Sequence, residues 1–328
     1  MRQMRLRAAS VRGFTLIELM VAMLLGLVVV AGVGSVFLSN QRVYRTNRAL
    51  SDVQDSSRIA FELLARDIRN AGLTACNNSS RVSNVLNAGP VNGGTAWWAN
   101  WNNAVRGYAG DDSDVPAGTG AGDRVAGTPS VQLIGGDEAS FSVATHVPST
   151  ALFTLNESSA DLNPNGVYVV CDFDHAAIFK SSAFNHAAKT IAHGTAGDNC
   201  SAGLGYPTVC SGTANTYTFG ANALITQLNA ADWYVGRNPA NGTSLYRLAR
   251  NGNGFEPFEM VRGVTSMVLT YHQPGLATPF VDAGSITNWT LVSAVRVTLR
   301  VQSIDGTAGA SPIDRTFTTT TTLRNRVQ

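Results

Sequence analysis

The longest apolar run of the chain lies near its start. From Phe14 to Leu38 there are 25 residues with a single ionisable side chain, Glu18. A helix rises about 1.5 Å per residue, so this run is long enough to cross a hydrocarbon core of roughly 30 Å. The run therefore predicts a membrane-spanning helix over residues 14–38.

Beyond residue 38 the apolar positions become periodic. Apolar or small residues recur at steps of three and four, as on one face of an amphipathic helix. They are Leu50, Val53, Ser57, Ala60, Phe61, Leu64 and Ile68. Opposite charges four residues apart, such as Arg58 and Glu62, lie on the other face and support a helix. One helix is predicted from Phe14 to about Asn70, with residues 39–71 as its amphipathic half and Gly72 just past its end.

Residues 72–136 lose this period and are rich in Gly, Asn and Ser, which predicts a loop-rich insertion. Its tryptophans, Trp97, Trp98 and Trp101, are expected to form a small core under a loop. In residues 137–328, short segments rich in β-branched and aromatic residues alternate with Gly, Asn and Pro, which predicts strands. These segments are Ser140–His146, Gly166–Phe173, Trp233–Gly236, Ser244–Leu248, Val264–Tyr271, Val292–Gln302 and Arg315–Leu323.

One of these segments indicates how helix and strands meet. Val295, Val297, Leu299 and Val301 alternate with polar residues, as in an antiparallel strand with one dry face. The dry face can receive the apolar stripe of the helix. The predicted fold class is α+β, with a long N-terminal helix packed on an antiparallel β-sheet domain with long loops.

Glu18 is a carboxylate deep in an apolar run, which costs about 2.5–3.5 kcal/mol on insertion scales. It therefore needs a positively charged partner. If the chain were cut after Gly13, Phe14 would carry a new α-ammonium group at the i,i+4 spacing that makes two groups neighbours on a helix. The carboxylate would then lie in the first helical turn, where the helix dipole favours negative charge.

The hexapeptide GFTLIE at residues 13–18 follows a leader with four arginines and no acid. It resembles the class III signal of type IV pilins and type II secretion pseudopilins. The resemblance implies that residues 1–13 are a leader peptide, cut by a prepilin peptidase between Gly13 and Phe14, and that Phe14 is then N-methylated. It also implies a role in assembly for Glu18 and the lollipop shape of pilins.

The same resemblance implies a location. The basic leader favours a cytoplasmic N-terminus. The chain is then expected as a single-pass protein of the inner membrane with a periplasmic domain, and later in an extracellular pilus.

Composition agrees with export. The full chain carries a formal charge of +2, but without the four leader arginines it has 20 basic against 22 acidic side chains. The basic balance is thus largely a property of the leader and gives no reason to expect nucleic acid as a partner. With 44% hydrophobic and 14% charged residues, the chain can also bury a core beyond its anchor.

The four cysteines, Cys76, Cys171, Cys200 and Cys210, all follow the predicted membrane segment. An even number in an oxidising compartment favours disulfides over a metal site. Three pairings are possible. If Cys200 and Cys210 close a local loop, Cys76 is left to pair with Cys171.

The sequence shows no pattern of a catalytic site. None of the five histidines lies in an H-E-x-x-H motif, and there is no G-x-S-x-G motif. The run from Asp172 to His175 is better explained as a strand end entering a turn than as a metal site. Asp111, Asp112 and Asp114 lack the spacing of a calcium loop and are expected to be solvated turn residues. We expect no enzyme activity, no cofactor and no metal.

Segments of the C-terminal half narrow the family resemblance. Residues 231–235, 244–247, 261–271 and 294–299 look like the corresponding segments of PilW-type minor pilins. That resemblance implies a structural subunit that joins other minor pilins, the major pilin and a tip adhesin. It would help to prime pilus assembly at the tip and support adhesion and twitching motility.

Two alternatives stay open. A J-type minor pseudopilin of a type II secretion system shares the signal and the helix, but such proteins are usually shorter. A signal-anchored periplasmic enzyme would need a convergent polar site, which the sequence does not show. Neighbouring genes would separate the first alternative from a minor pilin.

Overall fold

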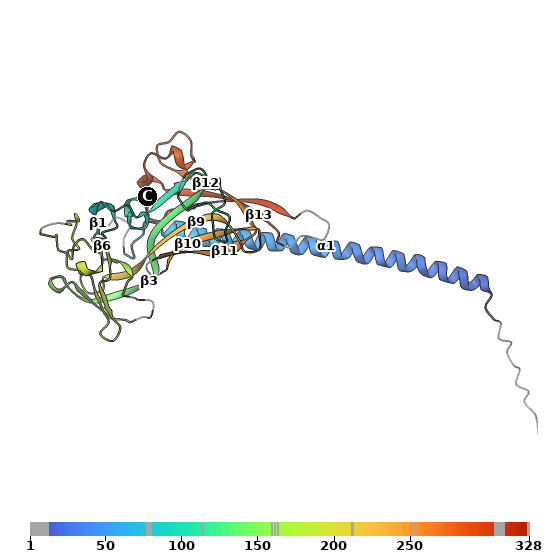
Figure 1. Ribbon diagram of the computed structural model, residues 1–328, viewed down its shortest axis with the longest axis horizontal. Coiled ribbons are helices and arrows are strands. Elements are labelled where there is room, and N and C mark those ends of the chain that lie inside the picture. The colour runs from blue at the N-terminus through green and yellow to red at the C-terminus, as the bar shows by residue number, and fades with distance from the viewer. Residues whose placement is uncertain are drawn as a thin grey trace, which may run out of the picture.

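The structure is a computed structural model that describes residues 13–76, 81–112, 114–158, 160, 162, 164–210, 213–251, 254–304 and 312–326. Of the leader predicted for residues 1–13, only Gly13 lies within the described residues. Figure 1 shows one long helix that leads into a domain built of strands. This is the lollipop-like α+β arrangement expected from the sequence.

The helix α1 spans Leu16–Asn70, 55 residues in one piece. The prediction of a single helix from Phe14 to about Asn70 is confirmed. Its N-terminal half projects far from the domain (Figure 1). Every helix residue before Ala49 is exposed, and burial begins where the amphipathic stripe begins.

The predicted stripe is the buried face of the C-terminal half of α1. The buried residues are Ala49, Val53, Ser57, Ala60, Leu64, Ala65 and Ile68. Leu50 and Phe61 are half-buried at the edge of the stripe. The hydroxyl of Ser57 donates to the carbonyl of Gln54 at 2.7 Å, so this polar member of the stripe is satisfied within the helix.

Gly72 fixes the end of α1 to the domain. Ala71 caps the helix, and Gly72 follows with a φ of +77°. The N–H of Gly72 donates to the carbonyl of Ile134 at 2.7 Å, and its own carbonyl accepts from Asn325 Nδ2 at 2.7 Å. The positive φ favours glycine, and a Cβ at this position would lie 2.5 Å from Asn325 Nδ2 and displace that amide from the Gly72 carbonyl.

Most described strands belong to one large sheet. Its strands are β1 (Arg81–Asn84), β2 (Val105–Tyr108), β3 (Ser130–Val147), β4 (Leu152–Leu155), β5 (Val167–Cys171), β6 (His175–Lys180), β7 (Ala183–Asn185), β8 (Thr190–Ala192), β9 (Leu224–Arg237), β10 (Thr243–Asn251) and β11 (Gly254–Arg262). The order is β1-β6-β5-β9-β3-β4-β8-β7, while β10 joins β9 to β11 and β2 pairs with β3. All pairs are antiparallel except β1 with β6.

A second, three-stranded antiparallel sheet contains β12 (Val264–His272), β13 (Ala294–Gln302) and β14 (Asp314–Thr322). The alternating residues Val295, Val297, Leu299 and Val301 of β13 are fully buried. They share one core with the helix stripe and with residues of β3 and β9. The dry face predicted for β13 therefore does help to bury the helix, which packs against both sheets.

The remaining helical elements are short 3-10 turns. They are η1 (Pro90–Asn92), η2 (Trp97–Ala99), η3 (Trp101–Asn103), η4 (Pro148–Thr150), η5 (Thr195–Gly197), η6 (Ala283–Ser285) and η7 (Trp289–Leu291). The three tryptophans of η2 and η3 are half-buried against a small core that includes Leu86 and Ile134, as predicted.

The strands differ from the prediction in extent and in number. Each of the seven predicted segments overlaps a strand, but β3 and β9 are 18 and 14 residues long. The strands β4, β6, β7, β8 and β11 were not predicted. The segment 72–136, expected to be loop-rich, also contains β1, β2 and the start of β3. β1 and β2 have four residues each, too few to show a clear alternation in the sequence.

Two disulfides join Cys76 to Cys171 and Cys200 to Cys210. Of the three possible pairings, this is the one in which the second bridge closes a local loop. The first bridge links two residues separated by 95 positions and ties the chain after α1 to the end of β5.

The double substitution Cys76→Ser/Cys171→Ser should destabilise the domain by about 2–4 kcal/mol, because a bridge across a long loop restricts the unfolded chain. Limited proteolysis and urea unfolding of the detergent-solubilised protein measure this loss. The double substitution Cys200→Ser/Cys210→Ser is the control. It should lower the free energy of unfolding less, because the Cys200–Cys210 disulfide closes a loop of only 10 positions. Alkylation of native protein without reductant should label none of the four cysteines, and four reactive thiols would contradict the pairing.

Candidate functional site

The N-terminal end of α1 contains the residues predicted for processing and assembly. Gly13 and Phe14 precede the helix and are exposed, and Glu18 lies in its first turn. No described atom comes within 4 Å of a Cβ built on Gly13. The peptide bond between Gly13 and Phe14 is therefore accessible in the described structure.

Thr15 is the N-cap of α1 and forms a capping box with Glu18. The N–H of Glu18 donates to Thr15 Oγ1 at 3.3 Å, and the N–H and hydroxyl of Thr15 both donate to the Glu18 carboxylate at 3.0 Å. Before cleavage, Thr15 therefore supplies the hydrogen bonds to the Glu18 carboxylate, because the free amine of Phe14 exists only after cleavage. Sequence reasoning missed Thr15, although T-x-x-E before an apolar run is the signature of this box.

The apolar half of α1 is uncovered. Among the described helices, α1 is the one long and apolar enough to span a membrane, and its most apolar 18-residue window has a mean hydropathy of 2.6 with none of it buried. A Cβ at Gly26, Gly32 or Gly34 would meet nothing within 4 Å. These glycines leave the backbone open to close approach by another helix.

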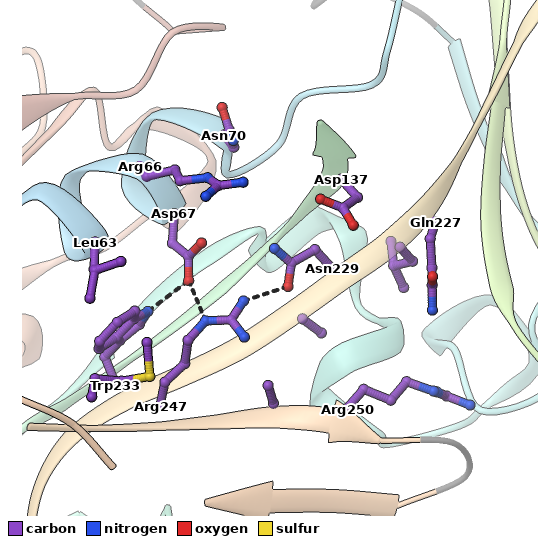
Figure 2. A pocket seen from close by; sticks show the side chains of 14 residues that line it. Leu63, Arg66, Asp67, Asn70, Asp137, Gln227, Asn229, Trp233, Arg247 and Arg250 are labelled. Carbon is purple, nitrogen blue, oxygen red and sulfur yellow. Dashed lines mark hydrogen bonds and ion pairs between the residues drawn. The ribbon is translucent and has the colours of Figure 1, made fainter. Parts of the chain in front are cut away.

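The other end of α1 is held by an ion pair, shown in Figure 2. The carboxylate of Asp67 accepts from Arg247 Nε at 2.7 Å and from Trp233 Nε1 at 2.9 Å. A further nitrogen of Arg247 donates to Asn229 Oδ1 at 2.7 Å. The side chains of Asp67 and Arg247 are only 11% and 19% exposed, so both charges depend on each other for solvation.

A cleft of about 360 Å³ surrounds this ion pair between α1 and strands β9, β10 and β11. Its polar lining includes Arg66, Asn70, Asp137, Gln227 and Arg250 (Figure 2). The charged groups at its base are already bonded to one another, and Arg66 pairs with Glu138 at 2.7 Å. We interpret the cleft as the joint between helix and sheet, because these charged groups are committed to holding the two elements together.

The run from Asp172 to His175, which most resembles a metal site in the sequence, is occupied by hydrogen bonds within the chain. The carboxylate of Asp172 accepts from the N–H groups of Asp174 (3.0 Å) and His175 (2.9 Å) and from the hydroxyl of Tyr217 (2.8 Å). The prediction of a strand end entering a turn is confirmed, since β5 ends at Cys171 and β6 begins at His175. Within the described ranges, no group of three or more His, Cys, Asp or Glu residues could hold a metal ion.

The prediction of solvated turn residues is confirmed for Asp111 and Asp112, which are exposed, but it is wrong for Asp114. Asp114 is half-buried and accepts from the Ser130 hydroxyl at 2.5 Å and from Gln132 Nε2 at 2.6 Å. It lies near the fully buried Asp232 of β9. Burial, and then the charge of Asp114, raise the pKa of Asp232 well above its usual value. A neutral Asp232 avoids a buried charge.

Sequence reasoning also missed a buried histidine pair. His146 Nδ1 accepts the N–H of Phe219 at 3.1 Å, so His146 Nε2 is the nitrogen that donates to His193 Nε2 at 3.0 Å. The ring of His146 stacks on Phe153 with 4.0 Å between centroids. Burial lowers the pKa of His146 to about 4, and burial followed by the neighbouring His146 lowers the pKa of His193 to about 3.

This pair predicts acid sensitivity. Because the folded pKa values lie below the value of about 6.5 expected in the unfolded chain, the pair stabilises the fold fully above pH 6.5. As the pH falls from about 6.5 towards 4, each histidine should lower the free energy of unfolding by roughly 1.4 kcal/mol per pH unit. Thermal unfolding of the detergent-solubilised protein at pH 7.5 and pH 5 tests this prediction. The decrease in melting temperature from pH 7.5 to pH 5 should be smaller in His193→Gln than in the wild type. It should be unchanged in the control His186→Gln, whose histidine is exposed. Equal falls in all three proteins would contradict this assignment.

Comparison with known families finds a match at the N-terminus. Residues 9–34 match the family model described as the prokaryotic N-terminal methylation motif. No curated protein and no solved structure matches the chain. The motif covers Gly13, Phe14 and Glu18 and supports a type IV pilin-like or pseudopilin protein with a structural role. It implies processing by a prepilin peptidase and assembly with other pilins.

Proposed function

We propose that the chain is a PilW-like minor pilin of a type IV pilus, which helps to prime pilus assembly at the tip. The observation that carries the proposal is the methylation motif of residues 9–34 at the start of a 55-residue helix with a bare apolar half. So long an uncovered apolar surface is unstable in water. Lipid, or a bundle of similar helices, would cover it.

In this proposal, lipid covers the apolar half of α1 first, and a bundle of pilin helices covers it afterwards. It is first an inner-membrane protein with a cytoplasmic leader and a periplasmic domain, where an oxidising compartment allows its two disulfides. It then leaves the bilayer, and α1 joins the helices of other minor pilins and the major pilin. A tip adhesin is the further partner, with adhesion and twitching motility as the outcome.

A J-type minor pseudopilin is the competing proposal, because the methylation motif is common to both classes. The large domain of this chain, with its two sheets, favours the minor pilin. Deletion of the gene separates the two proposals. A minor pilin should be needed for piliation and surface motility, whereas a pseudopilin should be needed for protein secretion.

Processing is the first test of the proposal. Intact-mass analysis of the membrane-purified protein should show loss of residues 1–13 and one added methyl group on Phe14. Gly13→Leu should block cleavage and leave membrane insertion intact, because the apolar run is unchanged. Gly26→Leu, an exposed glycine inside the run, is the matched control and should be cleaved normally. Uncleaved wild-type protein in cells with an active prepilin peptidase would contradict the pilin proposal.

A further inference from the structure

Three arginines follow the apolar half of α1 before the helix enters the domain. They are Arg42, Arg45 and Arg48, and all three are exposed. The ion pairs formed by the described residues include none of them. Residues spaced by three are neighbours on a helix surface, so the three guanidinium groups form one strip along α1, which we call the arginine strip.

The length of the apolar run places the arginine strip at the surface of a bilayer. Between Glu18 and Arg42 there is no ionisable side chain, and the apolar residues 19–38 of this interval number 20. At about 1.5 Å per residue they span about 30 Å, which is the thickness of the hydrocarbon core. Arg42 then lies about 6 Å beyond the core, in the headgroup layer, and Arg48 lies about 15 Å beyond it.

The direction of helical side chains brings the arginine strip closer to the lipid. In an α-helix the Cα–Cβ bonds tilt towards the N-terminus, and long side chains lean over the preceding turn. For the arginine strip, the preceding turns belong to the apolar half of α1. The guanidinium groups are therefore directed towards the headgroups, while their apolar stems lie along the helix.

Tyr44 lies at the same level as the arginine strip. Its side chain is 68% exposed. Tyrosine is enriched where hydrocarbon meets headgroups, because its ring is apolar and its hydroxyl is polar. Burial of α1 by the described domain starts only at Ala49. Residues 42–48 therefore have the composition of a segment at a membrane interface, and the described domain does not cover them.

Membrane topology does not explain the arginine strip. Basic residues beside a membrane span favour the cytoplasmic side, and the leader with its four arginines favours that side for the N-terminus. In the orientation proposed above, the arginine strip lies on the opposite, periplasmic side, where its charge acts against this orientation. On this point the inference rests on the proposed function. A ligand of opposite charge gives a reason for three unpaired arginines at this level.

We propose that the arginine strip binds the phosphate groups of anionic phospholipids in the periplasmic leaflet of the inner membrane. A guanidinium group pairs with phosphate oxygens through two parallel N–H groups, which makes arginine well suited to this ligand. An anionic headgroup such as phosphatidylglycerol carries a net negative charge. In phosphatidylcholine, an ammonium group cancels the charge of the phosphate. The arginine strip therefore selects anionic lipids and fixes the depth of α1 in the bilayer.

The acidic residues of α1 leave the arginine strip free for this ligand. Asp52 and Asp55 are the next acidic side chains along the helix, both are exposed, and neither forms an ion pair with another described residue. Asp52 lies about 6 Å further from the bilayer than Arg48. Lipid phosphates are already present at the level of Arg42, whereas a neighbouring protein would have to bring acidic side chains there. This favours lipid over an acidic protein surface as the partner.

Spin-label electron paramagnetic resonance on the membrane-purified chain in phosphatidylcholine vesicles tests the inference. A trace of spin-labelled phosphatidylglycerol or phosphatidylcholine reports how strongly each lipid associates with the protein. At low salt, phosphatidylglycerol should associate at least about fivefold more strongly, the effect typical of one basic residue at an anionic surface. In 1 M salt, where the Debye length is about 3 Å, the preference should fall below about twofold.

Substitutions assign the lipid preference to the arginine strip. The triple variant Arg42→Gln/Arg45→Gln/Arg48→Gln should lose the preference, and replacement of the same three arginines by lysine should keep most of it because the charge is kept. Arg58→Gln is the control and should match the wild type, since Arg58 is exposed on the same helix but lies about 30 Å beyond Leu38. All variants should float with the vesicles, because the apolar run is unchanged.

Equal association of the two lipids with the wild type would overturn the inference, and so would a preference that the triple glutamine variant keeps. If the wild type shows no preference and the triple glutamine variant does not enter pili, the arginines contact an acidic protein surface instead of lipid. The intact mass of the purified chain keeps the two proposals apart. A cleaved and methylated protein without the preference rejects the arginine strip alone, whereas an uncleaved protein with the preference rejects the pilin alone.

Discussion

Asp67→Ala is expected to lower the free energy of unfolding by about 3–5 kcal/mol, which is typical when one partner of a buried ion pair is removed. The loss would leave Arg247 with its charge largely out of water and would also remove the acceptor of Trp233 Nε1. Urea unfolding of the detergent-solubilised chain, followed by tryptophan fluorescence, measures the effect. Trp233 itself reports on the joint, because its indole bonds to Asp67.

The neighbouring residue supplies a matched control. Arg66 also forms an ion pair from the last turns of α1, but its side chain and that of Glu138 are 54% and 57% exposed. Exposed pairs contribute about 0–1 kcal/mol, so Arg66→Ala should change stability little. The double variant Asp67→Leu/Arg247→Met should recover most of the loss, because apolar residues can replace a buried pair at little cost. If Asp67→Ala and Arg66→Ala were equally stable, the joint would not depend on this ion pair.

The helix could be predicted from the sequence because its determinants are local. Its boundaries and buried face follow from the spacing of residues such as Val53, Leu64 and Ile68, and its end from Gly72. The capping box of Thr15 and Glu18 is equally local, because the two residues are three positions apart, although the sequence analysis did not single out Thr15.

The sheets could not be predicted to the same extent. β9 pairs with β3 across about ninety residues, and no local signal in either strand specifies its partner. The same holds for the joint, where Asp67 meets Arg247 across a separation of 180 residues. Only the fold brings these groups together.

Buried polar residues were the least predictable part. Asp232 stands next to Trp233 in a strand whose two faces are both covered, so its burial follows from sheet topology and not from alternation. His146 belongs to β3 and His193 to the segment after β8, and both rings contact Phe153, His146 stacked on it and His193 tilted against it. Titratable groups of this kind decide how stability depends on pH.

Glu18→Ala is expected to leave cleavage, membrane insertion and domain folding intact but to lower incorporation into pili at least tenfold. In the described helix, the nearest basic side chain towards the domain is Arg42, about 36 Å away along the axis. After cleavage, the amine of Phe14, its own or a neighbour's, is the cation that can reach the carboxylate. In an apolar bundle an unpaired carboxylate is costly, so pairing with a neighbour's amine would set the axial register between subunits.

Thr15→Ala is the control that separates charge from helix capping. It removes the hydroxyl of the capping box, which typically costs about 0.5–2 kcal/mol of local helix stability, but it keeps the Glu18 carboxylate. If charge pairing sets the register, Thr15→Ala should enter pili much like the wild type, and Glu18→Asp should be intermediate because it shortens the reach by one methylene. The measurement compares each variant in the sheared pilus fraction and in the membrane fraction. Incorporation of Glu18→Ala at the wild-type level would show that the carboxylate does not position the subunit, and equal defects in Glu18→Ala and Thr15→Ala would assign its role to the helix cap.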